Sequence, residues 1–312
     1  MIGLYCAQEC VLRPVGSDMA KDALWIDAVA PTPEEVELLH REYNLDLQDV
    51  ADCLDPNERS RVEIDEYYDL LLLRTLLNED RDERMATMPI GIFVTANKVI
   101  TVRLGSTFRN EEITADLRRR PKLDTKEDLL LAIVRRINRD IERRVRTMDT
   151  TITDVQEKIL AANRPDVARE AFMLSNGLIV LNTALLANLN AFSMLPRAKH
   201  IHLTKERLDL ADDLENDIAQ LYEMTTIYRE IMGNTLDAYE SAISNRLAIM
   251  MKTLATVSLI LVLPLLISSL FSMNVGLPFG DRLDPMNFWI VLAISAGGVL
   301  ALWALFRIKG IL

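Results

Sequence analysis

The apolar and polar positions of this chain fall into three regions: a mixed first part, a long helical middle and a strongly apolar end. Residues 253–273 and 286–306 each form a run of 21 residues without a charged side chain. A hydrocarbon core of about 30 Å needs about 20 helical residues, so each run predicts one membrane-spanning helix. The alternative, a buried helix pair in a soluble core, is disfavoured because two full-length runs follow each other. Residues 274–285 contain Gly and Pro and predict a short loop that closes a helical hairpin.

Residues 1–123 mix strand-like and helical patterns. Strands are predicted at 23–29 and 67–76, and a hairpin at 90–95 and 99–102 around the turn residues 96–98. A typical helix start is found at Thr32, Pro33, Glu34 and Glu35. Thr caps the first turn, Pro fits the first helical position, and acids in the first turn suit the helix dipole. We therefore expect a small cytosolic α/β domain.

Beyond residue 124 the pattern becomes helical. Long helices are predicted at 126–161 and 166–195, and a third begins near residue 204 and meets no proline until Pro264. The expected fold class is an α+β membrane protein, with a very long stalk helix and a two-helix C-terminal transmembrane hairpin. Its segments are a cytosolic α/β domain (1–123), a helical arm region (124–203), a stalk helix with the first span (204–273), an extracytoplasmic loop (274–285), and the second span with a basic tail (286–312).

The charge is unevenly distributed along the chain. The net charge is −11, and the residues after 245 hold five basic against two acidic side chains, which leaves −14 on residues 1–245. So acidic a region repels nucleic-acid phosphate and attracts cations, and nucleic acid is therefore not expected as a partner. Arg246 and Lys252 precede the first span, and Arg307 and Lys309 follow the second. The positive-inside rule then predicts a multi-pass protein of the inner (plasma) membrane with both termini in the cytosol.

One face of the long helix is polar where a coiled-coil seam would be apolar. Steps of three and four residues connect acids and amides in the cytosolic half, and small, hydroxyl or apolar side chains in the membrane half. We name this face the polar seam: Glu206, Asp209, Asp213, Asn216, Gln220, Glu223, Ile227, Glu230, Asn234, Asp237, Ser241, Ser244, Ala248, Met251, Ala255, Ser258, Val262, Leu265, Ser269 and Ser272. The apolar residues that fall on other faces and can pack are Leu214, Ile218, Leu221, Tyr228 and Met232.

Two interpretations of the polar seam are open at this point. It can be a solvated outer face followed by a stripe of small residues that packs against another helix. Alternatively, it lines a water-filled path along the axis of a helix ring, where acids attract cations and Met251 and Val262 form apolar constrictions that gate by dewetting. A straight helix drifts about 20° per heptad, so the pattern carries most weight between Glu230 and Val262. One hairpin cannot enclose a pore, and the second interpretation therefore requires an oligomer.

The end of the first span carries a recognisable motif. The chain reads Ser272-Met273-Asn274 there, followed by Val-Gly-Leu-Pro, with Ser-Asn-Arg at 244–246 and Met-Lys-Thr-Leu at 251–254 upstream. This pattern resembles the CorA-type divalent metal transporters, whose signature is Gly-Met-Asn at the outer end of the first of two C-terminal spans. The resemblance extends over the whole layout of the chain. Ser272 departs from the signature, because the family has glycine at this position.

The resemblance implies a homopentameric funnel whose stalk helices line the pore. Asn274, beside Met273 and Ser272, would hold a hydrated cation through its amide oxygen at the outer mouth, which suits magnesium because this ion dehydrates reluctantly. Asp237 takes the place of a pore acid. The pore-lining residues expected from the resemblance and the polar seam together are Ser241, Ser244, Asn245, Ala248, Met251, Leu254, Ala255, Ser258 and Val262. At the gate, the resemblance selects Leu254 and the polar seam selects Ala255.

These features predict divalent-cation transport, most simply magnesium influx, with other copies of the chain, the lipid bilayer and the cation as partners. Transport of zinc or another transition metal, with or without coupled protons, is the alternative that Ser272 keeps open. A non-conducting membrane-anchored sensor or scaffold is the third. Asp213, facing an acidic loop that contains Asp80, Asp82 and Glu83, is the expected site for sensing cytosolic magnesium. No cofactor is expected, and no motif for catalysis is present in the sequence.

Three further motifs are interpreted as ordinary structure. Cys6, Cys10 and Cys53 lack metal-ligand spacing and are expected to be free thiols. His200 and His202 alone do not make a metal site. Acids interrupt the cluster of arginines at 135–146, so this helix is expected to form ion pairs rather than to bind nucleic acid.

Overall fold

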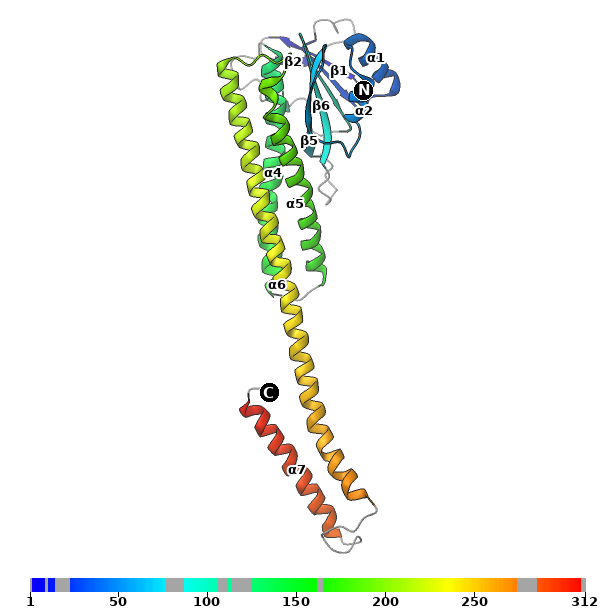
Figure 1. Ribbon diagram of the computed structural model, residues 1–312, viewed down its shortest axis with the longest axis vertical. Coiled ribbons are helices and arrows are strands. Elements are labelled where there is room, and N and C mark those ends of the chain that lie inside the picture. The colour runs from blue at the N-terminus through cyan, green and yellow to red at the C-terminus, as the bar shows by residue number, and fades with distance from the viewer. Residues whose placement is uncertain are drawn as a thin grey trace. The chain divides into compact units, whose positions relative to one another are not determined.

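The computed structural model describes residues 2–8, 11–14, 23–76, 87–105, 112–113, 125–161, 165–273 and 285–309 (Figure 1). It separates into two compact units, Met1–Leu236 and Asp237–Leu312. The long helix α6 (Lys205–Ser272) contributes to both units.

A seven-stranded mixed sheet forms the centre of the first unit. Its strands are β1 (Ile2–Gln8), β2 (Val11–Pro14), β3 (Trp25–Val29), β4 (Arg61–Ile64), β5 (Tyr68–Leu76), β6 (Thr87–Thr95) and β7 (Val99–Arg103). They lie in the order β2-β1-β3-β7-β6-β5-β4. Neighbouring strands run antiparallel, except for the parallel pair β3 and β7. The predicted strands at 23–29 and 67–76 and the predicted hairpin are confirmed as β3, β5 and the β6–β7 pair, whereas the sequence pattern missed β1, β2 and β4.

The central strands are buried on both faces of the sheet. Leu70, Leu72 and Phe93 belong to one core, which they share with the helices α1 (Pro33–Tyr43) and α2 (Leu47–Asp52). Successive side chains of a strand point to opposite faces, so Leu71 and Leu73, which are also buried, face the other side. The predicted start of α1 is confirmed, because the Thr32 hydroxyl accepts from the Glu35 amide and the Glu35 carboxylate accepts from the Thr32 amide. The sequence pattern did not identify α2.

Two long helices cover the second face of the sheet, as Figure 1 shows. They are α4 (Lys126–Ala161) and α5 (Pro165–Phe192), close to the predicted bounds 126–161 and 166–195. Asn188 ties α5 to the sheet, because its amide bonds both the Arg74 N–H and the Arg74 carbonyl of β5. A 3₁₀ turn, η2 (Leu195–Arg197), follows α5. Cys6 and Cys53 are buried free thiols, and Cys10 lies outside the described residues.

Three described helices are long and apolar enough to cross a membrane, namely Val167–Arg197, Lys205–Ser272 and Met286–Ile308. Half of the apolar window of the first is buried inside the structure, against 6% for each of the other two. Contacts with the sheet and with α4 therefore account for the apolar surface of α5. In the second unit, α6 and α7 (Pro285–Ile308) leave their apolar side chains exposed, as helices facing lipid must. These two contain the predicted spans.

Candidate functional site

The first half of α6 packs through one face and leaves the polar seam exposed. Leu214, Ile218, Leu221 and Met232 are buried, as predicted, and Tyr228 is partly buried. Side chains of the neighbouring helices also reach the backbone of α6, since Asn138 donates to the carbonyl of Leu214 and Asn182 to that of Tyr222. Every seam residue from Glu206 to Asn234 is exposed. The face that other copies of the chain or ions can approach is therefore the acidic one.

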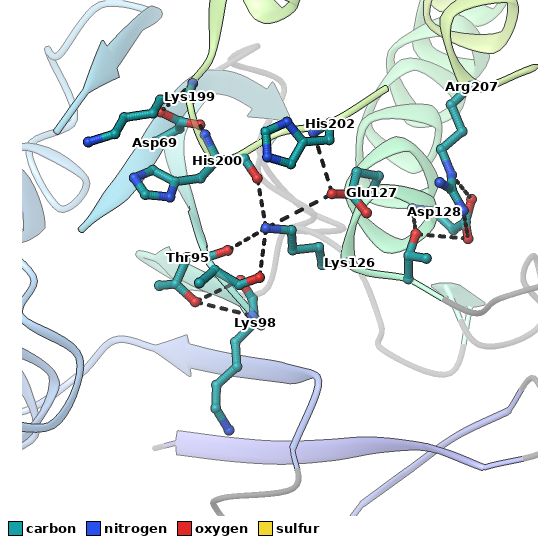
Figure 2. A network of polar contacts seen from close by, with 12 residues as sticks. Asp69, Thr95, Lys98, Lys126, Glu127, Asp128, Lys199, His200, His202 and Arg207 are labelled. Atoms are coloured by element: carbon teal, nitrogen blue, oxygen red, sulfur yellow. Dashed lines mark hydrogen bonds and ion pairs between the residues drawn. The ribbon is translucent and has the colours of Figure 1, made fainter. Parts of the chain in front are cut away.

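A set of polar contacts holds the segment before α6 against the sheet and α4 (Figure 2). The Lys126 ammonium donates to the carbonyls of Thr95 (2.8 Å), Ala96 (2.9 Å) and His200 (2.7 Å), and lies 3.9 Å from the Glu127 carboxylate. Partial burial lowers the pKa of Lys126, although Glu127 opposes this shift. One amino group thus joins the β6–β7 turn, α4 and the segment leading to α6.

Two carboxylates complete this attachment. Asp69 is fully buried and accepts from the backbone N–H groups of Lys199 and His200. Asp128 forms a two-point ion pair with Arg207 in the first turn of α6, at 2.8 and 3.1 Å. The direction in which α6 leaves the first unit's sheet is set by these contacts. His200 also lies 3.1 Å from the Glu66 carbonyl, so its ring takes part in structure.

A groove of about 620 Å³ lies between α4 and α6 in the first unit. Partial removal from water raises the pKa of Asp217 in this groove, and the negative charges of Glu142 and Asp213 raise it further. Burial likewise raises the pKa of Tyr228, which bonds Asp149. Arg135, Arg139 and Arg146 line the same groove, and Arg146 pairs with Glu142 at 2.7 Å, so the groove carries charges of both signs.

In the second unit, α7 packs against one narrow stripe of α6. From residue 253 to 273 the side chains that are not exposed are Thr256, Ile260, Leu263, Pro264, Ile267 and Phe271. Gly298 of α7 lies directly over this stripe, because a Cβ built there would stand 2.8 Å from Leu263 Cδ2 and 4.0 Å from Ile267 Cδ1. A glycine at this position allows the two helices to approach closely.

The polar seam lies on the opposite side of α6. An α-helix turns about 100° per residue, so the centre of the seam from Ala255 to Ser272 stands about 180° from the centre of the stripe that α7 covers. Met251 and Val262 fall within about 30° of the seam's centre by the same rotation. At the gate, the resemblance selected Leu254 and the polar seam selected Ala255. The two residues lie about 50° from the seam's centre, one on each side. Both can therefore border one path.

The other expected pore residues follow the seam to different degrees. Asp237, Ser241, Ser244, Asn245 and Ala248 are all exposed. Extending the rotation places Ser244 about 30°, Asp237 about 50° and Ala248 about 70° from the seam's centre. Ser241 stands about 90° and Asn245 about 130° away. The geometry thus groups Asp237, Ser244 and Ala248 with Met251, and does not group Asn245 with them.

The C-terminal end of α6 holds Ser272, the residue that departs from the expected Gly-Met-Asn signature. Ser272 is the last residue of the helix, and its hydroxyl donates to the Ser269 carbonyl at 2.9 Å. Among the described residues, the positive φ values of non-glycine residues are those of Ala30 and Asn44, so Ser272 needs no left-handed conformation. Met273 follows, half exposed, and Asn274 lies outside the described residues. Serine is therefore accommodated without backbone strain.

Within the described ranges, no three His, Cys, Asp or Glu side chains gather closely enough to hold a metal ion. Asp213 is exposed, and Asp80, Asp82 and Glu83, its expected counterparts, lie outside the described residues. The predicted ion pairs of the arginine cluster are confirmed where the structure shows them, for Arg136 with Asp140 and Glu112, for Arg143 with Asp140, and for Arg146 with Glu142.

Comparison with known proteins agrees with this geometry. Residues 20–308 match the model of the family described as CorA-like Mg2+ transporter protein. The cobalt/magnesium transport protein CorA of Methanocaldococcus jannaschii is 27% identical over 298 residues, which cover 92% of this chain and 90% of that protein. The complete structure of the CorA magnesium transporter from the same organism superposes with a TM-score of 0.85 at 24% identity, over 98% and 97% of the two chains.

A second solved structure, that of the full-length CmaX protein, has a TM-score of 0.77 at 20% identity and covers 98% of this chain and 96% of its own. These structures share the mixed sheet, the long helices and the apolar C-terminal helices, and so confirm the predicted fold class. The family match covers nearly the whole chain. Because this is a family of ion transporters, the chain is not an enzyme. The chain belongs to the CorA-like Mg2+ transporter family, and it is a membrane-embedded transporter of divalent cations.

Proposed function

We propose that this chain is one subunit of a homopentameric channel that admits magnesium passively into the cell. The observation that carries the proposal is the position of the polar seam, about 180° around α6 from the stripe that α7 covers. In a ring of hairpins, α7 would face lipid and the seam would face the axis. The alternative interpretation is a solvated outer face followed by a stripe that packs against another helix. The position of α7 disfavours α7 as that helix, because α7 lies on the other side of α6.

Each part of the path has a chemical role in this proposal. Asn274 presents an amide oxygen at the outer mouth, where it can bind a magnesium ion that keeps its water shell. Met251 and Val262 narrow the path with apolar side chains, which close it when water leaves. Asp237 and the acids of the seam above it, such as Glu230, hold the cation at the cytosolic side.

The direction of transport follows from charge and topology. We place both termini in the cytosol and the loop 274–285 outside the plasma membrane, because four basic residues flank the other end of the hairpin, whereas the loop holds one basic residue, Arg282, against two acids. A doubly charged ion that enters an inside-negative cell gains about 4.6 kcal/mol per 100 mV. Influx therefore needs no fuel and no coupled proton.

The decisive experiment is flux of magnesium into liposomes that contain the purified full-length protein. Magnesium- and zinc-sensitive dyes are trapped in parallel samples, and wild type is compared with Asn274→Ala and Asp237→Ala. We expect magnesium entry that Asn274→Ala abolishes and Asp237→Ala reduces. Asp212→Ala is the matched control, because Asp212 is an exposed acid of the same helix beside the seam.

The outcomes separate the three hypotheses. Zinc entry without magnesium entry would mean that this chain, with Ser272 in place of glycine, is a transition-metal transporter. No flux of either ion through intact oligomers would favour a sensor or scaffold, and would contradict the assignment of the polar seam to a pore. Oligomer size, measured by mass photometry in detergent, tests the pentamer independently of flux.

A further inference from the structure

Two grooves border the polar seam in the first unit, one on each side of α6. The α4 groove, of about 620 Å³ between α4 and α6, includes Gln220 of the seam, and the α5 groove, of about 550 Å³ between α5 and α6, includes Asn216. Counted at about 100° per residue, the α6 residues of the two grooves are centred about 70–80° from the centre of the seam, on opposite sides. In a ring of five copies with the seam inward, the two neighbours stand about 54° to either side of the inward direction. The α4 groove of one copy therefore faces the α5 groove of the next.

The two grooves differ in charge. The charged residues of the α5 groove are Asp212 and Glu215, so this groove is acidic. The α4 groove contains both signs, and two of its three arginines, Arg139 and Arg146, make polar contacts within the chain. The third, Arg135, forms no ion pair or hydrogen bond with any residue in the described ranges, and the same holds for Glu215. Each groove thus presents a charge that has no partner in the described part of its own chain.

Arg135 and Glu215 are also partly buried, whereas Asp212 is exposed. Removal from water costs free energy for a charged group without a partner, and an opposite charge within contact distance offsets this cost. A neighbouring copy can supply the opposite charge to both residues, because one belongs to the α4 groove and the other to the α5 groove.

The two residues lie at the same level of the helical bundle. The helices α4 and α6 run side by side in the same direction (Figure 1), since Asn138 bonds the Leu214 carbonyl and a later bond between the two helices keeps nearly the same offset. These contacts put Arg135 level with residues 211–214, and so within about 6 Å of Glu215 along the axis at 1.5 Å per residue. Copies related by a ring axis stand at equal heights, so the two residues can meet across the contact.

Helix rotation directs the two acids of the α5 groove to different layers of such a ring. Asp212 stands about 60° and Glu215 about 120° from the centre of the seam. On the other side of α6, the residues that α4 bonds place that helix about 110° from the same centre. Asp212 therefore points towards the neighbouring α6, whereas Glu215 points towards the outer layer, where the neighbouring α4 lies.

We propose that Arg135 of one copy and Glu215 of the next form an ion pair at every contact of the ring. Because the paired residues lie on different faces, each contact is head-to-tail, and a closed ring leaves neither charge unpaired. The inference rests on the proposed pentamer with the seam inward, and it adds the residues that fix how the two faces of each copy meet.

Charge reversal tests the pair in the full-length protein, purified in mild detergent at low salt, where ion pairs are least screened. Arg135→Glu places two acids opposite each other at every contact, and Glu215→Arg places two bases there. We expect either change to raise the protein concentration at which half of the rings dissociate by at least about 10-fold, because facing like charges are strongly unfavourable. The double variant Arg135→Glu/Glu215→Arg restores opposite charges, and should return this concentration to within about 3-fold of the parent protein.

Mass photometry measures the oligomer, and circular dichroism of each variant reports whether the chain has folded. Arg144→Glu is the matched control, because Arg144 is a partly buried arginine about 180° around α4 from Arg135 and lines neither groove. This control should leave the dissociation unchanged. The neutral variants Arg135→Gln and Glu215→Gln introduce no repulsion, and each should weaken the ring about as much as both together.

The results separate this pair from the pentamer itself. Rings that remain as stable in both reversal variants as in the parent, or a double variant no more stable than the single ones, would overturn the pair and leave the proposed pentamer and its ion flux standing. A parent protein that forms no ring would overturn both proposals.

Discussion

Gly298 offers a direct test of the packing that turns the polar seam away from α7. A Cβ at this position would stand 2.8 Å from Leu263 Cδ2, whereas a Cβ at the neighbouring Gly297 would meet no atom within 4 Å. The perturbation is therefore Gly298→Val, with Gly297→Val as its matched control. Both changes put the same residue in the same helix, so helix propensity affects both variants equally. The difference in stability between them therefore reports the contact with Leu263.

The magnitude follows from the overlap. Normal contact begins near 3.4 Å, so Leu263 must move by several tenths of an ångström and α7 must shift if the side chain cannot turn. Overpacking of this kind costs about 1–3 kcal/mol. We expect Gly298→Val to be less stable than Gly297→Val by that amount, or roughly 5- to 150-fold in the folding equilibrium.

The assay is a titration of the protein in mild detergent with a denaturing detergent, followed by circular dichroism. The double variant Gly298→Val/Leu263→Ala removes the overlapping atoms, and should recover part of the lost stability through a coupling of about 0.5–3 kcal/mol. Equal stability of the two valine variants, or strict additivity with Leu263→Ala, would refute this packing. The 180° relation between α7 and the polar seam would then lose its basis.

Three further predictions test other parts of the argument. The pKa of Asp217 is raised in the folded state, so its ionised form costs stability above its unfolded pKa of about 3.9. Asp217→Asn should raise the melting temperature at pH 7 by more than Asp212→Asn, a control outside the α4 groove, and should lose this advantage as the pH falls towards 4. Met251→Asn should increase magnesium flux into liposomes, because a polar side chain keeps the constriction hydrated. If Met250→Asn, about 100° away around the helix, has the same effect, Met251 is not the constriction. Lys126→Met leaves three backbone carbonyls without their donor. This loss should lower the free energy of unfolding by about 1–3 kcal/mol and speed hydrogen exchange in residues 198–204. Unchanged exchange there would show that the ammonium does not hold this segment.

Local pattern was sufficient for α1, for the long helices and for the membrane hairpin, but not for the short helix α2. The capping residues Thr32 and Glu35 and the uncharged runs of α6 and α7 act over a few neighbouring positions, so the chain itself reveals them. The strands β1, β2 and β4 escaped. The edge strands β2 and β4 have four residues each, too few for a clear apolar alternation, and β1 is held by its neighbours β2 and β3 in the sheet.

The polar seam was readable in the sequence because helix periodicity alone places its residues on one face. Which way that face points could not be read, since it depends on where α7 packs, and α7 packs where Gly298 permits close approach to Leu263 and Ile267. The attachment of α6 was hidden for the same reason. Lys126, Asp69 and Asp128 meet the segment before α6 only after the sheet has assembled. Periodicity is a property of one helix, whereas orientation is a property of contacts between elements, and only the tertiary structure supplies those.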